Sequence, residues 1–119
     1  MKKHVLLVED AADLRALLGR VLGEEDYRVS LAATLAAARP VLARGGVDLL
    51  VTDIVLPDGR GTELVAEAST RGVPLLAITG HPDEMHGLDR DGRAYLAKPF
   101  RPGQFLRRVA ELIGAAEAV

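Results

Sequence analysis

One stretch near the middle of the chain, residues 49–59, constrains the possible folds more than any other. It reads Leu-Leu-Val-Thr-Asp-Ile-Val-Leu-Pro-Asp-Gly, so an apolar run leads directly into Asp53 and a Pro-Asp-Gly turn follows. A short, bounded apolar run is typical of a strand buried on both faces, as in parallel sheets. We therefore expect Asp53 at the carboxyl end of a central strand, where open parallel α/β sheets place their ligands. Taken alone, the stretch is equally compatible with an aspartate that only caps a loop.

Composition narrows the class of protein. The 119 residues predict one domain, residues 1–119, and because 49% are hydrophobic but only 3% aromatic, its core must be built from Val, Leu and Ala. A formal net charge of -2 argues against direct binding of nucleic acid or of an anionic membrane. The lack of cysteine excludes disulfides and thiolate metal sites. No apolar segment has the length of a membrane span or a signal peptide, so a cytoplasmic protein is expected.

The rest of the chain alternates short apolar runs with helical patterns. Apolar residues at helical spacing predict four amphipathic helices, and Pro40 is expected to kink or shorten the second of them. Residues 81–92 contain Pro82, Gly87 and several acidic residues, which predict a poor helix. Repeated β-α units with short connections indicate an α/β protein with a parallel sheet and helices on both faces. The strands are expected at residues 5–8, 27–31, 49–53, 73–78 and 95–97, and the helices at Leu14–Leu22, from a Thr34 cap to Leu42, from a Thr62 cap to Gly72, and from Pro102 to Ile113.

Polar side chains follow four of the five predicted strands. Because parallel strands end at one edge of a sheet, these side chains should converge there. Three converging carboxylates would repel one another, and an all-oxygen set relieved by a divalent cation suits Mg²⁺. The ammonium group of Lys98 and the hydroxyl group of Thr79 would complete a pocket for an anion at Asp53. Each residue alone has an ordinary explanation as a cap or a solvated side chain, but five strand-terminal groups together favour a site. The five are Glu9, Asp10, Asp53, Thr79 and Lys98.

The ordered motifs resemble the receiver domain of two-component response regulators over essentially the whole chain. This resemblance implies a flavodoxin-like (βα)5 three-layer sandwich whose parallel sheet has strand order 2-1-3-4-5, here with a short or mobile fourth helix. It also implies a phosphoprotein that takes a phosphoryl group from a histidine kinase or a histidine phosphotransfer protein and then controls a protein partner. The motifs that carry the resemblance are Val8-Glu9-Asp10, Asp53 with Leu56-Pro57-Asp58-Gly59, Thr79-Gly80, and Tyr95-Leu96-Ala97-Lys98-Pro99-Phe100.

The resemblance assigns a role to each matching position. Asp53 is the phosphoacceptor, and Thr79 and Lys98 grip the phosphoryl oxygens. Tyr95 is the aromatic switch that turns inward when Thr79 moves. Mg²⁺ is bound directly by Asp10, Asp53 and the backbone carbonyl of Val55, with Glu9 acting through water. Such a domain phosphorylates and dephosphorylates itself but is not a turnover enzyme, and it is expected as a monomer or weak dimer.

Three features depart from the usual receiver pattern. Thr79 and Lys98 are only nineteen positions apart (98 − 79), which predicts a shortened fourth helix. With Pro74 near the start of the fourth predicted strand, this is partly similar to the receiver subgroup called FAT GUY, although Leu75 and Ala77 replace its phenylalanines. Val55 stands where a polar residue is common. Nothing follows residue 119 as an output domain, which predicts either a stand-alone regulator or a receiver from a hybrid kinase.

Two other functions compete with the receiver interpretation. A phosphohydrolase of the haloacid dehalogenase type also uses an Asp nucleophile, Thr, Lys and Mg²⁺, but its second Asp would fall at Val55. A phosphate-independent receiver-like adaptor is the other alternative, although such domains usually lack one of the key residues. The three histidines, His4, His81 and His86, have no metal-ligand spacing, and loop or surface positions are expected for them. Residues 81–92 are predicted to be the mobile segment that reports phosphorylation.

Overall fold

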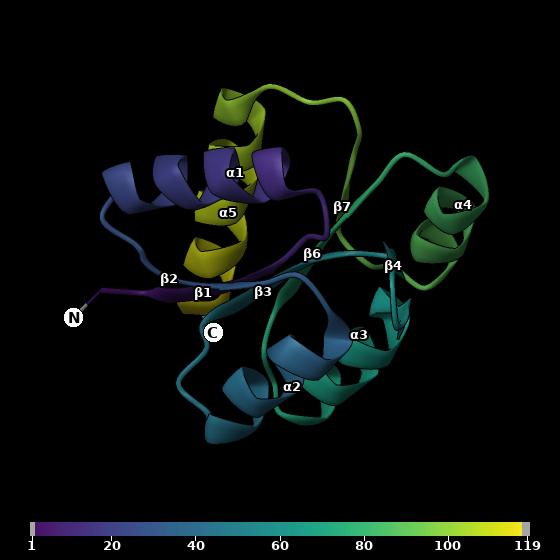
Figure 1. Cartoon of the computed structure of the whole chain (residues 1–119), viewed down its shortest axis with the longest axis horizontal. Helices are drawn as coiled ribbons and strands as arrows, with labels where there is room; N and C mark the ends of the chain where they lie inside the picture. The colour runs from purple at the N-terminus through teal and green to yellow at the C-terminus, as the bar shows by residue number, and fades with distance from the viewer. Residues whose placement is uncertain (1, 118–119) are drawn as a thin grey trace.

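The computed structural model describes residues 2–117 and shows a five-stranded parallel sheet between two layers of helices (Figure 1). The strand order is β2-β1-β3-β6-β7. It matches the predicted order 2-1-3-4-5, because the intervening β4 and β5 form a separate small hairpin. The sheet strands are β1 (His4–Val8), β2 (Arg28–Ala32), β3 (Leu49–Asp53), β6 (Leu75–Thr79) and β7 (Tyr95–Ala97), and the hairpin strands are β4 (Val55–Leu56) and β5 (Gly59–Arg60).

The apolar residues of the sheet divide between two helical layers, which confirms the three-layer sandwich. Val5 and Leu7 belong to the core under α1 and α5, whereas Leu6 and Val8 belong to the core on the opposite face. This alternation is the period of two expected of a strand buried on both sides. Figure 1 shows α1 and α5 above the sheet and α2 and α3 below it, with α4 at the β7 edge. The helices are α1 (Ala12–Glu24), α2 (Leu35–Arg44), α3 (Gly61–Thr70), α4 (Pro82–Arg90) and α5 (Pro102–Glu117).

Helix ends follow some of the predicted signals and not others. The Thr34 hydroxyl accepts the Ala37 N–H at 3.1 Å and caps α2, as expected. Pro40 lies inside α2, which continues to Arg44, so of the two predicted effects the shortening does not occur and the kink stays a prediction. The predicted Thr62 cap is wrong: α3 begins at Gly61, and the Glu63 carboxylate accepts the Arg60 N–H at 3.3 Å instead. A backbone donor before the first turn is thus satisfied from within the helix.

The segment after β6 is a helix, contrary to the poor propensity of its sequence. α4 has nine residues and is the shortest helix among the described residues, whereas its shortening relative to the usual spacing of the family that it resembles stays a prediction. Pro82 occupies the first turn, where its missing N–H costs nothing. Leu88 is its single buried side chain, and Met85 is half-buried. Tertiary contacts therefore stabilise a helix that propensity alone disfavours.

His4 differs from its predicted surface or loop position. It is buried in β1, where Nδ1 lies 3.2 Å from the Gly46 carbonyl oxygen and Nε2 lies 2.7 Å from Ser30 Oγ. A buried imidazole is tolerated here because both ring nitrogens have partners. The reason for the error is that the histidine directly precedes an apolar run and extends that strand by one residue. Among the described residues, no helix is both long and apolar enough to cross a membrane.

Candidate functional site

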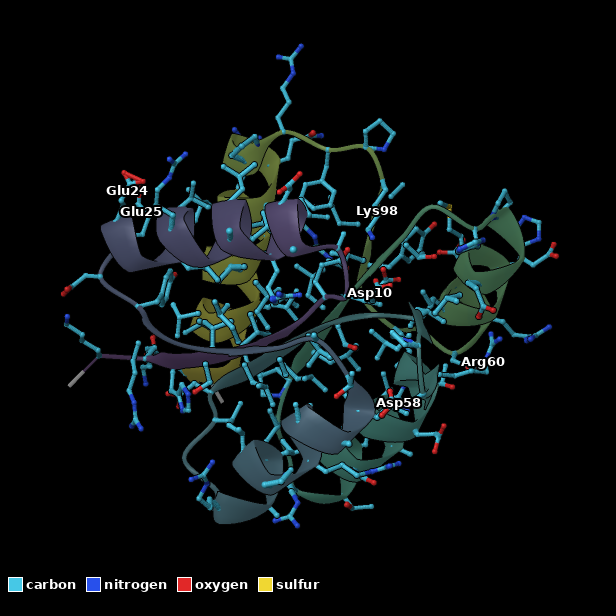
Figure 2. All side chains as sticks on the ribbon, viewed as in Figure 1. Asp10, Glu24, Glu25, Asp58, Arg60 and Lys98 are labelled. Atoms are coloured by element: carbon cyan, nitrogen blue, oxygen red, sulfur yellow. The ribbon has the colours of Figure 1, made fainter. Side chains whose placement is uncertain are left out.

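The predicted strand-end residues meet at the carboxyl edge of the sheet. Asp53 and Thr79 are the last residues of β3 and β6, and Glu9 and Asp10 directly follow β1. Lys98 follows β7, and its backbone N–H donates to the Thr79 carbonyl at 2.8 Å, which fixes the start of its loop. Figure 2 shows Asp10 and Lys98 at this end of the molecule, between α1 and α4. The parallel topology thus assembles groups that are up to 89 positions apart.

Lys98 joins two buried carboxylates. Its Nζ donates to Asp53 Oδ2 at 2.7 Å and to the Glu9 oxygens at 3.0 and 3.2 Å. Glu9 is completely buried, and the Asp53 side chain is 9% exposed. Buried carboxylates require such a partner, because the loss of hydration disfavours their charged form. The single ammonium group of Lys98 therefore donates hydrogen bonds to both acids.

The protonation of this cluster reflects its burial. Burial, followed by the hydrogen bond to Asp53, raises the pKa of Glu9 from 4.5 to about 7, although Lys98 opposes the shift. Burial alone would lower the pKa of Lys98, but the hydrogen bonds to Asp53 and Glu9 outweigh it and raise that pKa. Lys98 thus remains a cation, while Glu9 is poised to exchange a proton near neutrality.

The three acids also fit a hard divalent cation. One oxygen each from Glu9, Asp10 and Asp53 can be chosen so that all lie within 4.8 Å of one another. Asp10 is exposed, unlike the other two, so the cluster opens to solvent on its side. Two buried acids share a single lysine, so added positive charge would lower their mutual repulsion. An all-oxygen set open to water has the ligand chemistry that Mg²⁺ prefers.

Two neighbours of Asp53 that sequence reasoning missed fix its backbone. The Thr52 hydroxyl donates to the Asp53 carbonyl at 2.8 Å in a fully buried position. Gly61 lies against the same carbonyl, and a Cβ at Gly61 would overlap the Asp53 oxygen. Its N–H donates to the Ile54 carbonyl at 2.7 Å. The first residue of α3 must therefore be glycine for Asp53 to hold this position, a requirement that only the spatial contact reveals.

The two predicted switch residues both have contacts that lead to α4. Thr79 is buried, and its hydroxyl accepts the N–H of His81, the residue that precedes α4, at 3.1 Å. Tyr95 is half-buried, and its hydroxyl donates to Asp89 Oδ2 on α4 at 3.1 Å. One contact lies at the beginning of α4 and the other near its end. A displacement of either switch residue would therefore be transmitted to this helix.

The hairpin after Asp53 is tied to two helices, which sequence reasoning also missed. The Asp58 carboxylate accepts the N–H groups of Leu35 and Ala36 at 2.9 and 3.0 Å and so caps α2 together with Thr34. These two hydrogen bonds, that to Leu35 first, lower the pKa of Asp58. The Arg60 guanidinium forms an ion pair with Glu84 of α4. Figure 2 shows Asp58 on the α2 side of the hairpin and Arg60 below α4.

Comparisons with known proteins agree with this architecture. A family model described as the response regulator receiver domain matches residues 5–110. The TorCAD operon transcriptional regulatory protein TorR of Escherichia coli strain K12 is 34% identical over 119 residues, which cover 95% of this chain and 51% of that protein. The chain spans about half the length of the curated relatives it matches.

Solved structures show the same fold. A CheY-like response regulator receiver domain protein from Methanospirillum hungatei JF-1 superposes with a TM-score of 0.90 at 28% identity, covering 99% of this chain and 98% of the other. The non-phosphorylated HemR receiver domain from Leptospira biflexa gives a TM-score of 0.84 at 32% identity and covers 94% of each chain. Both comparisons cover more than nine-tenths of this chain.

Proposed function

Because this chain belongs to the response regulator receiver domain family of two-component signalling, we propose that Asp53 is its phosphoacceptor. The observation that carries the proposal is the contact between Asp53 and Lys98 at 2.7 Å, at the open end of the sheet and beside two further acids. The phosphoryl group comes from a histidine kinase or a histidine phosphotransfer protein. The phosphorylated domain then controls a downstream protein partner in the cytoplasm, without contacting nucleic acid itself.

The chemistry is a transfer between a phosphohistidine and the Asp53 carboxylate. A carboxylate oxygen forms the new O–P bond as the donor's N–P bond breaks, and the imidazole nitrogen keeps that electron pair and takes up a proton. Lys98 Nζ already contacts Asp53 Oδ2, so it is placed to meet a phosphoryl oxygen attached there. The Thr79 hydroxyl accepts a hydrogen bond from His81 and retains its own proton to donate to another phosphoryl oxygen.

The acidic cluster would hold Mg²⁺ through Asp10, Asp53 and the Val55 carbonyl, with Glu9 one water further away. The bound ion supplies positive charge that offsets the carboxylate and phosphoryl charges. The surroundings of Glu9 and Asp10 support their different roles. Both Glu9 oxygens contact Lys98, whereas the Asp10 carboxylate is exposed. We therefore expect Asp10→Ala to weaken Mg²⁺ binding more than Glu9→Ala, as measured by calorimetric titration. The reverse order would contradict this ligand assignment.

Phosphorylation is read out through α4. A phosphoryl group that draws the Thr79 hydroxyl toward Asp53 also pulls on the His81 N–H, and hence on the start of α4. Tyr95 then breaks its hydrogen bond with Asp89, and its ring moves into the space behind Thr79. The exposed surface of α4 and β7 changes as a result, and a partner that prefers the new surface selects the phosphorylated state.

The competing functions are distinguished by the same features. A haloacid dehalogenase-type hydrolase would need an acid two positions after its nucleophile, where this chain has the exposed side chain of Val55. As a receiver, this protein modifies itself and does not turn over a separate substrate. A phosphate-independent adaptor would bind its partner without any change at Asp53.

Intact mass spectrometry after incubation with a small-molecule phosphodonor and Mg²⁺ tests the proposal. The wild-type protein should gain one phosphoryl group, and Asp53→Asn should gain none. Asp58→Asn is the matched control, because it removes an acid close to Asp53 in the sequence while its amide oxygen can still accept one of the two α2 N–H groups. Full labelling of Asp53→Asn would refute the assignment. Sustained hydrolysis of phosphate monoesters would favour the hydrolase, and an unlabelled wild-type protein would favour the adaptor.

A further inference from the structure

Arg15 lies beside the acidic cluster and has none of the roles described above. From the first turns of α1, its side chain reaches back to the loop that joins β1 to α1. Nη1 donates to the backbone carbonyl of Glu9 at 2.9 Å and to that of Asp10 at 3.3 Å. A guanidinium Nη carries two hydrogens, so this one nitrogen can serve both carbonyls. Arg15 thus holds the backbone of two residues that contribute carboxylates to the cluster.

The loop needs such a contact because it has few others. Ala11, the residue before α1, offers no side-chain oxygen to cap the helix, and alanine is among the poorest residues at this position. Glu9 is held on its other side, where its N–H donates to the Ala32 carbonyl at 3.0 Å. Within residues 2–117, the exposed Asp10 carboxylate has no hydrogen bond or ion pair with another protein group. The position of Asp10 therefore depends on its backbone.

We propose that Arg15 is a positioning residue for the metal site, acting through the backbone carbonyls of Glu9 and Asp10. The inference rests on the proposed function, because the ion concerned is Mg²⁺ bound by Asp10 and Asp53. A ligand that is already held near its binding position loses less conformational freedom when the ion binds. Groups that orient metal ligands commonly change metal affinity about tenfold to a hundredfold when they are removed. Arg15 acts one step further back, on the backbone, so the lower end of that range is expected.

An alternative, purely electrostatic role predicts the opposite sign. Arg15 is a cation near a cation site, and within residues 2–117 it forms no ion pair with a carboxylate. If its charge were all that mattered, removing it would strengthen Mg²⁺ binding. If its hold on the loop matters, removing it weakens Mg²⁺ binding despite the lost repulsion. The direction of the change thus separates the two roles.

Calorimetric titration of metal-free protein with Mg²⁺ is the direct test. We expect Arg15→Met to bind Mg²⁺ about tenfold more weakly than the wild-type protein. Arg20→Met is the matched control: it removes the same charge from the same helix, at a residue whose partner is Glu24, and should stay within about twofold of wild type. Hydrogen exchange provides a second readout without metal, because the Asp10 and Ala11 amides should exchange faster in Arg15→Met only. Circular dichroism establishes that each variant is folded.

The outcomes distinguish this inference from the function on which it rests. Mg²⁺ binding by Arg15→Met that equals or exceeds that of the wild-type protein would overturn the role of Arg15 while leaving the Mg²⁺ site intact. A wild-type protein that does not bind Mg²⁺ at all would refute the proposed metal site itself. If Arg15→Met does not fold, Arg15→Gln, which keeps a polar group but lacks the reach, is titrated against the same criteria.

Discussion

The two helices that flank β7, α4 and α5, are held to the molecule in opposite ways. α5 buries Phe105, Val109 and Ile113, and Phe105 also stacks on Phe100 with ring centroids 5.9 Å apart. α4 fully buries only Leu88, with Met85 half-buried, and it also makes two polar contacts, the Arg60–Glu84 ion pair and the Tyr95–Asp89 hydrogen bond. Apolar burial is strong and non-directional, whereas exposed polar contacts contribute little and exchange readily. We therefore expect α4, and not α5, to respond to an event at Asp53.

The largest contrast is expected from truncating the buried anchor of each helix. Phe105→Ala should lower the free energy of unfolding by about 3–5 kcal/mol, because it empties a fully buried site in the core. Leu88→Ala should cost less than half as much, since the loss cannot exceed the small free energy by which α4 is docked. Urea denaturation of the two variants measures both values. Equal losses would show that α4 is as firmly docked as α5.

A change of pH separates the polar site from the apolar anchors. The pKa of Glu9, at about 7, is raised above its ordinary value of 4.5, so the folded protein holds this proton more tightly than the unfolded chain does. The stability of the metal-free protein should therefore fall as the pH rises from about 4.5 through 7, by up to roughly 3 kcal/mol. Glu9→Gln should remove this dependence of stability on pH. Phe105→Ala should lower the stability at every pH and leave the dependence on pH unchanged. A wild-type slope retained in Glu9→Gln would refute the assignment.

Breaking the ion pair of α4 should have a smaller and more local effect. Arg60→Gln is expected to lower the free energy of α4 opening by about 0.5–1 kcal/mol, which corresponds to a twofold to fivefold faster amide exchange in α4. Arg108→Gln provides the control, because it breaks an ion pair that lies within α5, with Glu111, and should leave α4 unchanged. Amide exchange measured residue by residue compares the two variants. Unchanged exchange in α4 of Arg60→Gln would mean that the ion pair does not hold this helix.

The smallest effect is expected from Tyr95→Phe, which removes only the hydroxyl bonded to Asp89. Because this hydrogen bond is exposed, its loss should lower the free energy of α4 opening by about 0.5 kcal/mol and roughly double the amide exchange rate near the end of α4. Tyr27→Phe removes a hydroxyl far from α4 in the chain and should leave that rate unchanged. If Tyr95→Phe slowed amide exchange in α4, the hydrogen bond would destabilise the helix and not stabilise it.

The same contrast explains how much the sequence could predict. The strands and the strand-end site are predictable because short apolar runs define the strands and parallel strands bring their ends together, whereas the strand order follows only from the resemblance to receiver domains. The same reasoning places Asp53, Thr79 and Lys98 at one edge of the sheet. α5 was equally predictable, since its apolar stripe repeats at helical spacing from Phe105 to Ile113. Local pattern and global fold agree in these regions.

The features that escaped prediction depend on contacts between distant residues. Arg60 and Glu84 are 24 positions apart, and no local pattern indicates that they pair. The need for glycine at position 61 follows from the approach of the Asp53 carbonyl, which only the folded chain reveals. The hydrogen bonds from Arg15 to two backbone carbonyls cannot be predicted from the spacing of apolar residues. α4 is predicted to be a poor helix from its local composition, Pro82, Gly87 and several acidic residues, because the contacts that Arg60 and Tyr95 make with it cannot be seen in that segment.

The central claim is that phosphorylation of Asp53 is read out by α4, and amide exchange tests it most directly. In the free protein, residues 83–91 should exchange much faster than Val5–Val8 of β1. With Mg²⁺ and a phosphoryl mimic, residues 83–91 should become measurably protected, α5 should not change, and Asp53→Asn should show no response. Protection of residues 83–91 equal to that of β1 before activation, or unchanged after it, would contradict the account.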